Sequence, residues 1–124
     1  MSVVTDRFGP EHDHVSRGFS IHLLLPGSAQ LPPNRVSYKA RHGLVFRFVP
    51  VRLPDGRYRA YIVDQPSYKG RPDDANQVHR LRDQHGYYVC WDPEPRRADD
   101  LLKVMRVWAE ATAVYIDTGH FGPR

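Results

Sequence analysis

The chain has 124 residues, of which 40% are hydrophobic and 26% charged, and this length and composition predict one globular domain. The single cysteine, Cys90, excludes an internal disulfide bond and a cysteine-rich zinc site. The net charge of +4 would suit nucleic acid, acidic lipid or an acidic protein, but the basic residues are dispersed and charge alone selects no partner. No apolar run approaches the ~20 residues of a membrane helix, and no signal peptide is evident. We therefore expect a cytoplasmic protein that makes no membrane contact.

Residues 1–18 are polar and interrupted by glycine and proline, which predicts a flexible N-terminal arm before a domain over residues 19–124. The arm contains "EHDH", in which His12, Asp13 and His14 could approach a metal ion from an extended segment. Nothing nearby reliably supplies another ligand, so a solvated arm explains these residues better. We expect no metal and no organic cofactor.

Three strands are predicted in the first half of the domain. "FSIHLLLP", residues 19–26, predicts a short strand that a proline and a glycine end. Residues 43–53 and 57–64 flank the dipeptide Asp55-Gly56, which is typical of a β-hairpin turn. The residues expected to share one face of the return strand are Tyr58, Ala60 and Ile62.

The second half is expected to hold two strands and one helix. Residues 65–77 include two prolines, a glycine and two aspartates, which indicate irregular structure. Residues 78–83 and 87–92 predict two strands around a turn. The following segment has an acidic first turn, a narrow polar face and Gly119 at its end, and so predicts a long, mostly buried helix. The element order predicts an α+β fold, an antiparallel β-meander with a long C-terminal helix.

Cys90 lies at the end of an aromatic strand, and two histidines, His79 and His85, precede that strand. In cysteine proteases a histidine accepts the thiol proton, and the cysteine commonly stands at a helix N-terminus. Here Pro93 separates Cys90 from the predicted helix, and no asparagine or aspartate is identifiable by spacing as the residue that orients the histidine. The pattern therefore disfavours a protease.

The order of motifs resembles that of ubiquitin-conjugating enzymes, which have the UBC-like fold. His79 stands eleven residues before Cys90, about where this family has a histidine, and Gly86 stands four residues before it. The closing helix, with Trp108 and the sequence "YIDTGHF", is similar to that of small bacterial ubiquitin-conjugating-like proteins of anti-phage operons. The resemblance covers roughly residues 44–122. The residues with the spacing of the family's proline–tyrosine loop are Pro66, Tyr68 and Pro72.

The resemblance implies a transferase that carries a thioester on Cys90. Cys90 would accept the activated C-terminus of a ubiquitin-like or other donor protein and pass it to a lysine of a target protein. His79 or His85 would shape the groove, and Asp92 would orient or deprotonate the incoming amine. An activating enzyme is implied as a partner, because the chain has no Gly-rich phosphate loop for ATP.

The chain departs from the family pattern after His79. The family continues with proline and asparagine, but this chain has Arg80 and Leu81, so the asparagine that would steady the oxyanion is missing. Asn76 is close in sequence but is not assigned that role. This departure favours another hypothesis, a non-catalytic UBC-like adaptor with Trp108 and Tyr115 under a protein-binding face.

Two further alternatives remain open at this level. Cys90 could be a core thiol, because free cysteine is among the most buried residue types. The chain could also be a basic nucleic-acid-binding module that places a sheet in the major groove. The arginines on or beside predicted strands that would serve this function are Arg47, Arg52, Arg57, Arg59, Arg80 and Arg82.

Overall fold

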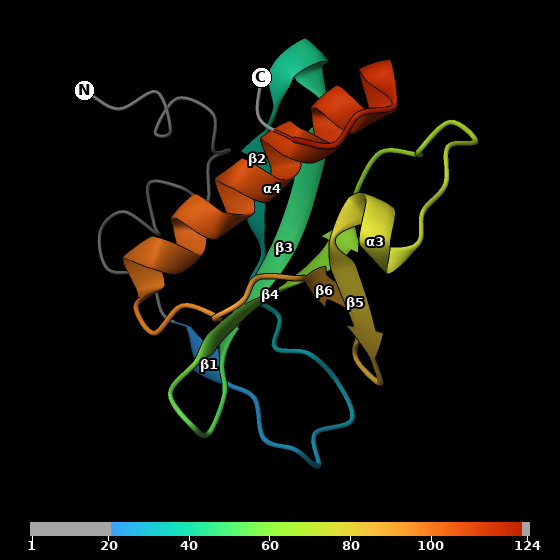
Figure 1. The fold of residues 1–124 in the computed structure, drawn as a ribbon. Coiled ribbons are helices and arrows are strands. Elements are labelled where there is room, and N and C mark those ends of the chain that lie inside the picture. The colour runs from blue at the N-terminus through green and yellow to red at the C-terminus, as the bar shows by residue number, and fades with distance from the viewer. Residues whose placement is uncertain (1–20, 123–124) are drawn as a thin grey trace.

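The structure, a computed structural model, describes residues 21–122. The predictions for the arm at 1–18 and for its histidines therefore lie outside the described residues. Within the described part, a six-stranded mixed sheet carries a long helix across one face (Figure 1). The elements are β1 (His22–Leu23), β2 (Val36–Lys39), the 3-10 turn η1 (Arg41–Gly43), β3 (Val45–Arg52), β4 (Tyr58–Asp64), α3 (Ala75–Val78), β5 (Arg80–Asp83), β6 (Gly86–Val89) and α4 (Ala98–Thr118).

The predicted central hairpin is confirmed as β3 and β4. Gly56 has a φ of 92°, a conformation that glycine adopts without a steric penalty, and its amide donates to the carbonyl of Leu53 at 2.9 Å. The Asp55 side chain accepts the backbone amide of Arg57 at 3.0 Å and so stabilises the same turn.

The sheet is mixed, so the prediction of an antiparallel meander is wrong in two respects. The antiparallel run β2-β3-β4 continues to β6, whereas β5 forms the edge of the sheet. The sequence of β5, "RLRD", is charged and suits an edge, while β6 contributes the buried Val89. In addition, β1 pairs with β3 in parallel through His22 and Val51.

Several predicted boundaries also change. Of the strand expected over 19–26, the described residues 21–26 show only the two residues of β1, and β2 was not predicted. The segment expected to be irregular, 65–77, ends in α3, because the Asp74 side chain caps that helix by accepting the Gln77 amide at 2.9 Å. The last strand ends at Val89 rather than at residue 92.

The long helix is confirmed, and it covers one face of the sheet. Gly119, with a φ of 80°, ends α4 as its C-cap. Trp108 is 2% exposed and meets the rings of Phe46 and Phe48 edge-on, at centroid distances of 5.7 and 6.1 Å. The helix is mostly buried, as predicted, and one stripe of its buried residues consists of Leu101, Met105, Trp108, Thr112 and Tyr115. Tyr58, Ala60 and Ile62 face this core together, as predicted.

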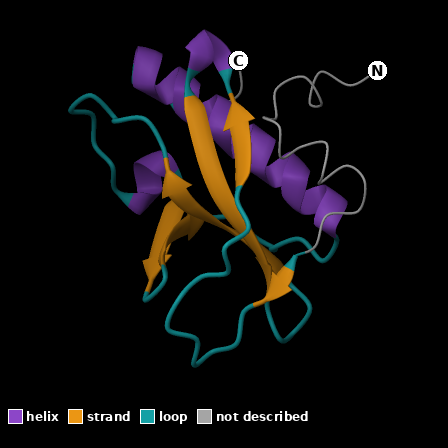
Figure 2. Ribbon diagram, turned by 180° about the vertical axis from the view of Figure 1, so that it is seen from behind, coloured by secondary structure: helices purple, strands orange, loops and turns teal. Residues whose placement is uncertain are grey.

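The opposite face carries a second, smaller core. Figure 2 shows the sheet from this side, with α4 behind it. Here Val49, Val51 and Tyr61 pack with Leu24 and Leu31 from the connection between β1 and β2. Side chains alternate between the two faces along each strand, which is why β3 contributes to both cores. No helix in residues 21–122 has both the length and the apolar character needed to span a bilayer.

Candidate functional site

Cys90 lies immediately beyond the end of β6, where the chain leaves the sheet. Its backbone amide donates to the carbonyl of His79 at 2.9 Å, and the residue is half-buried with a free thiol. Because β6 ends one residue earlier, the alternation of the strand no longer determines which way Cys90 points. The hydrogen bond places His79 beside Cys90, eleven residues away in sequence.

His79 is held beside Cys90 by the short helix α3. It is the C-cap of that helix and has a left-handed backbone, with φ 54°, which is uncommon for a residue other than glycine. Its amide donates to the carbonyl of Ala75 at 2.9 Å, and its ring packs on Phe121 with centroids 4.6 Å apart. Trp108 donates from Nε1 to the carbonyl of Val78 at 2.9 Å and so joins α4 to this corner.

A pocket of about 320 Å³ opens at this position. It brings together three of the four predicted site residues, namely His79, Cys90 and Asp92. The other residues that line it are Trp91, Val107, Trp108, Ala111 and Phe121. The pocket therefore has mostly apolar walls, with one thiol, one imidazole and one carboxylate among them.

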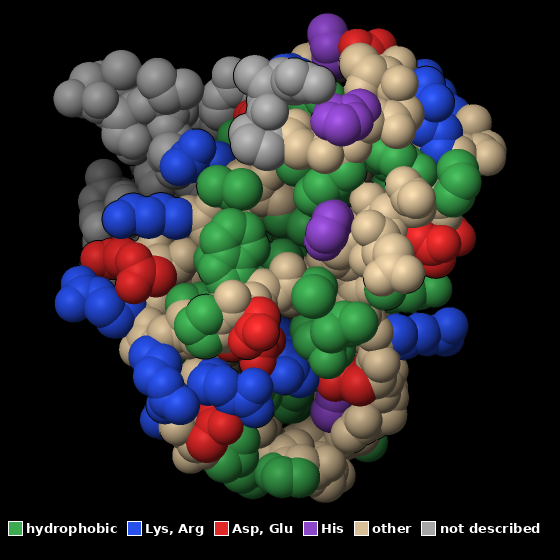
Figure 3. Space-filling model, viewed as in Figure 1, with side chains coloured by type: hydrophobic (Ala, Val, Ile, Leu, Met, Phe, Trp, Pro, Cys, Tyr) green, Lys and Arg blue, Asp and Glu red, His purple; other side chains and the backbone are tan. Residues whose placement is uncertain are grey.

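Trp91 separates this pocket from a second hollow of about 370 Å³. Its side chain is 40% exposed, and Trp91 and Val107 line both spaces. Pro93, Pro95 and Val104 add to the second hollow. Figure 3 shows hydrophobic side chains gathered on this face beside α4. The apolar surface around Cys90 thus continues along the segment that leads into α4.

His85, the fourth predicted site residue, does not belong to the Cys90 pocket. It follows β5 in the β5–β6 turn, and its Nε2 lies 2.7 Å from the carbonyl oxygen of Ser28. Its ring packs edge-on against Tyr61 at 5.8 Å, on the face opposite α4, and its side chain is only 3% exposed. A contribution of His85 to the chemistry of Cys90 is therefore not supported by its position.

The proline–tyrosine loop packs beside α3 and the C-terminal half of α4. Tyr68 meets Tyr115 edge-on at 6.0 Å, and the Tyr115 hydroxyl donates to the carbonyl of Pro72 at 2.6 Å. Val78 belongs to the same buried cluster as Tyr68, so this loop abuts the helix that holds His79. Asn76 lies within α3 and does not line the Cys90 pocket.

Most of the arginines proposed for nucleic acid are already paired with carboxylates. Figure 3 shows basic and acidic side chains interleaved on the side of the β3–β4 turn. A phosphate would have to displace these carboxylates before it gained a full charge interaction. The pairs are Arg47–Asp64 at 2.8 Å, Arg57–Asp55 at 2.6 Å, Arg57–Glu94 at 2.8 Å, Arg59–Glu94 at 2.7 Å and Arg80–Asp73 at 3.7 Å.

Residues 21–122 contain no group of three histidine, cysteine, aspartate or glutamate side chains that could hold a metal ion. Comparison of the chain with protein-family models, with curated proteins and with solved structures found no match. The functional argument therefore depends on the residues of the pocket and on their arrangement.

Proposed function

We propose that the protein is a ubiquitin-conjugating-like thioester carrier with Cys90 as its acceptor. The observation that carries the proposal is that one pocket brings together His79, Cys90 and Asp92, which are up to 13 residues apart in the sequence. The half-buried thiol lies at the end of a strand, next to apolar walls on which an extended peptide could lie.

The chemistry requires two exchanges at the thiol. In the first, the Cys90 sulfur attacks the thioester carbonyl of a donor protein bound to its activating enzyme. A new carbon–sulfur bond forms at Cys90, and the enzyme's thiol leaves. In the second, a target lysine amine attacks the same carbonyl, an amide forms and the Cys90 thiolate leaves. Asp92 would accept the proton that the amine loses.

The role of His79 is to shape the pocket. Its ring is packed on Phe121 and its backbone carbonyl fixes Cys90, so both sides of the residue are already engaged. The residues that line the pocket include no asparagine, and we assign no oxyanion-stabilising side chain. A carrier needs no strong base that would hydrolyse its cargo, and a single carboxylate near the thiol is consistent with this requirement.

The deciding experiment is an intact-mass comparison of wild type and Cys90→Ser, each purified from the native host without reductant. We expect a wild-type adduct that dithiothreitol removes, because a thioester exchanges with thiols. Cys90→Ser should retain the same added mass as an oxyester that dithiothreitol does not cleave. The added mass then identifies the donor protein by its size.

Native thiol labelling supplies the control. Because Cys90 is the only cysteine, every alkylated protein reports on this position alone. If no adduct forms and the thiol reacts only after unfolding, Cys90 is a core residue and the proposal is wrong. If the thiol reacts in the folded protein, yet no adduct forms and Cys90→Ala keeps the protein's biological effect, the adaptor hypothesis replaces the carrier.

A further inference from the structure

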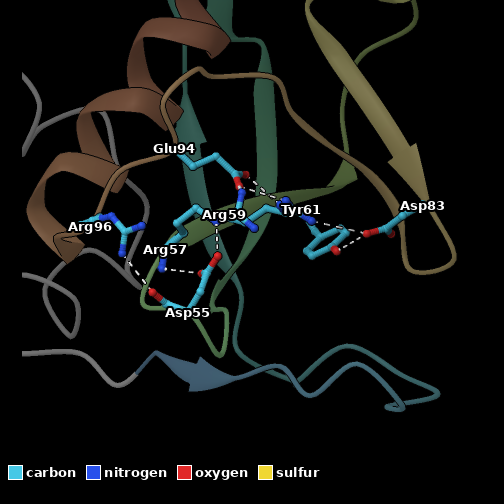
Figure 4. Close-up of polar contacts among 7 residues, drawn as sticks. All are labelled: Asp55, Arg57, Arg59, Tyr61, Asp83, Glu94 and Arg96. Carbon is cyan, nitrogen blue, oxygen red and sulfur yellow. Dashed lines mark hydrogen bonds and ion pairs between the residues drawn. The ribbon is translucent and has the colours of Figure 1, made fainter.

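The segment that leads from Cys90 to α4 is fastened to the β3–β4 hairpin at three consecutive residues. Pro95 accepts the backbone amide of Tyr58 through its carbonyl at 2.7 Å, and Arg96 donates to the carbonyl of Asp55 at 2.9 Å. Immediately before them, the side chain of Glu94 turns toward the hairpin strand β4 (Figure 4). None of these contacts was predictable from local sequence, because each joins residues more than 30 positions apart.

Glu94 is the most strongly held of the three. Its carboxylate accepts Nε and Nη2 of Arg59 at 2.7 and 2.9 Å, and Nη1 of Arg57 at 2.8 Å. The side chain is only 9% exposed, so water competes little with these charge-assisted bonds. Because two guanidinium groups bind the Glu94 carboxylate, the side chain has one favourable position. This position also restricts the backbone of Glu94.

Arg59 is itself immobilised from the opposite side. Its guanidinium lies over the Tyr88 ring at 4.0 Å and is 3.6 Å from the Asp83 carboxylate, which accepts the Tyr61 hydroxyl at 2.5 Å. Burial, the largest single influence, lowers the pKa of Arg59, but the hydrogen bonds with Glu94 and Tyr61 and the charge interactions with Glu94 and Tyr88 together outweigh burial and raise the pKa. The guanidinium therefore stays charged, and Glu94 is bound to a fixed point on the sheet.

Cys90 thus lies between two backbone positions that hydrogen bonds fix. On one side its amide is bonded to His79, and on the other side Glu94 is bonded to the two arginines. Only residues 91–93 separate these anchors, so a shift of Glu94 must be taken up next to the thiol. Trp91 and Asp92, which lie in this short span, are walls of the Cys90 pocket.

We propose that Glu94, bound by Arg57 and Arg59, is a positioning residue that sets the exposure and reactivity of the Cys90 thiol. A consequence for catalysis rests on the carrier function proposed above. The effect of Glu94 on the exposure and reactivity of the thiol does not depend on that function. Glu94 acts through the backbone of 91–93 and touches no reacting atom.

The test is the rate at which iodoacetamide alkylates Cys90 in the folded full-length chain, followed by intact mass. Glu94→Gln places an amide nitrogen against guanidinium donors, which weakens the anchor while keeping the side-chain shape. We expect alkylation about tenfold faster than in wild type, because the segment opens locally more often. The rate should rise at every pH without a change in the shape of its pH profile, as expected for a change of access.

Asp64→Asn is the matched control. It also removes one carboxylate from an arginine on neighbouring strands, the Arg47 pair at 2.8 Å, but it lies away from residues 91–97. Its alkylation rate should equal that of wild type. A Glu94→Gln rate equal to wild type would overturn the proposal, and so would a shifted pH profile at an unchanged maximal rate, since Glu94 would then act only through its charge.

Arg57→Gln is a second variant that weakens the binding of Glu94. Its effect should be smaller, because this arginine is 38% exposed and makes only one of the three bonds to Glu94. Its alkylation rate should lie between those of wild type and Glu94→Gln. Repeating the labelling in low urea separates local from global opening, because local opening exposes little surface and depends weakly on denaturant. A steep urea dependence would show that the variants act through overall stability, and the proposal would fail. The carrier function can fail on its own, if no donor adduct forms while Glu94 still controls the thiol.

Discussion

The two faces of the sheet are stabilised by different kinds of interaction. Under α4 the contacts are apolar and aromatic, with Phe46, Phe48 and Trp108 at their centre. On the opposite face a small apolar cluster borders a network of charged and phenolic groups, in which Arg59 and Tyr61 take part. The Cys90 pocket depends on both faces. Helix α4 supplies part of its lining, and Glu94 binds Arg57 and Arg59 on the opposite face and so holds the neighbouring segment that contributes Trp91 and Asp92. Apolar packing thus shapes the pocket, and the ion pairs of Glu94 fix the position of the segment next to Cys90.

The largest effect is expected from Trp108→Ala, which removes the aromatic centre of the helix-covered face. Trp108 is 2% exposed, so truncation should lower the free energy of unfolding by about 3–5 kcal/mol. The variant also loses the hydrogen bond from Nε1 to Val78, which joins α4 to the corner that holds His79. Urea denaturation followed by far-UV circular dichroism measures the change.

Trp91→Ala is the matched control for this prediction, because the same side chain is deleted where it is 40% exposed. Its free energy of unfolding should change by less than about 1 kcal/mol, as is usual for exposed positions. Equal losses in the two variants would contradict the view that Trp108, and not Trp91, is part of the stabilising core.

A smaller effect is expected on the opposite face from Tyr61→Phe. The Tyr61 hydroxyl donates to Asp83 at 2.5 Å, and losing a hydrogen bond to a charged group should cost about 1.5–3 kcal/mol at neutral pH. Burial and the bond to Asp83 raise the pKa of Tyr61 above its usual value of 10.0. Above pH 10 the unfolded chain therefore loses this proton while the folded protein keeps it, and stability falls as the pH rises.

In Tyr61→Phe the free energy of unfolding should accordingly fall less steeply than in wild type as the pH rises above 10. Part of the slope should remain, because burial also raises the pKa of Tyr68, and Tyr61→Phe/Tyr68→Phe should remove that part too. Denaturation midpoints at pH 8, 9.5 and 10.5, with tyrosinate absorbance in parallel, test this. Identical slopes in wild type and both variants would mean that these phenols do not govern alkaline unfolding.

The sequence predicts the parts of the fold whose signals are local. The hairpin around Asp55-Gly56 and the helix that Gly119 ends are confirmed, because turn chemistry and a 3.6-residue period depend on neighbouring residues. The pairing of β4 with β6 and the parallel pairing of β1 were not predicted, since partner choice depends on contacts between distant segments. The one-turn helix α3 is too short to show a period, although its capping residue Asp74 was visible.

For the candidate site, the sequence singles out the thiol but not everything around it. His79 and Asp92 are brought to Cys90, whereas His85 lies on the other face, although it is closer to Cys90 in sequence than His79 is. The β5–β6 hairpin explains this outcome, because His85 lies in its turn, whereas the pairing of Arg80 with Val89 at its open end returns the chain to His79. Phe121 and Glu94 were not predicted at all, because a side chain that packs or pairs across more than 30 residues leaves no local pattern.

The smallest effect is expected from Asp55→Asn, which tests an exposed carboxylate that shares Arg57 with the buried Glu94. The Arg57 backbone amide and then its guanidinium lower the pKa of Asp55 below 3.8. This contribution to stability is present above pH 4 and is lost as the pH falls through the lowered pKa. Asparagine still accepts the Arg57 amide and keeps the turn, so at pH 7 the thermal midpoint should match wild type within replicate scatter. Below pH 4 the variant should lose stability less steeply than wild type. If Asp55→Asn instead lowered the thermal midpoint clearly at pH 7, the exposed pair of Asp55 with Arg57 would contribute to stability in spite of its exposure.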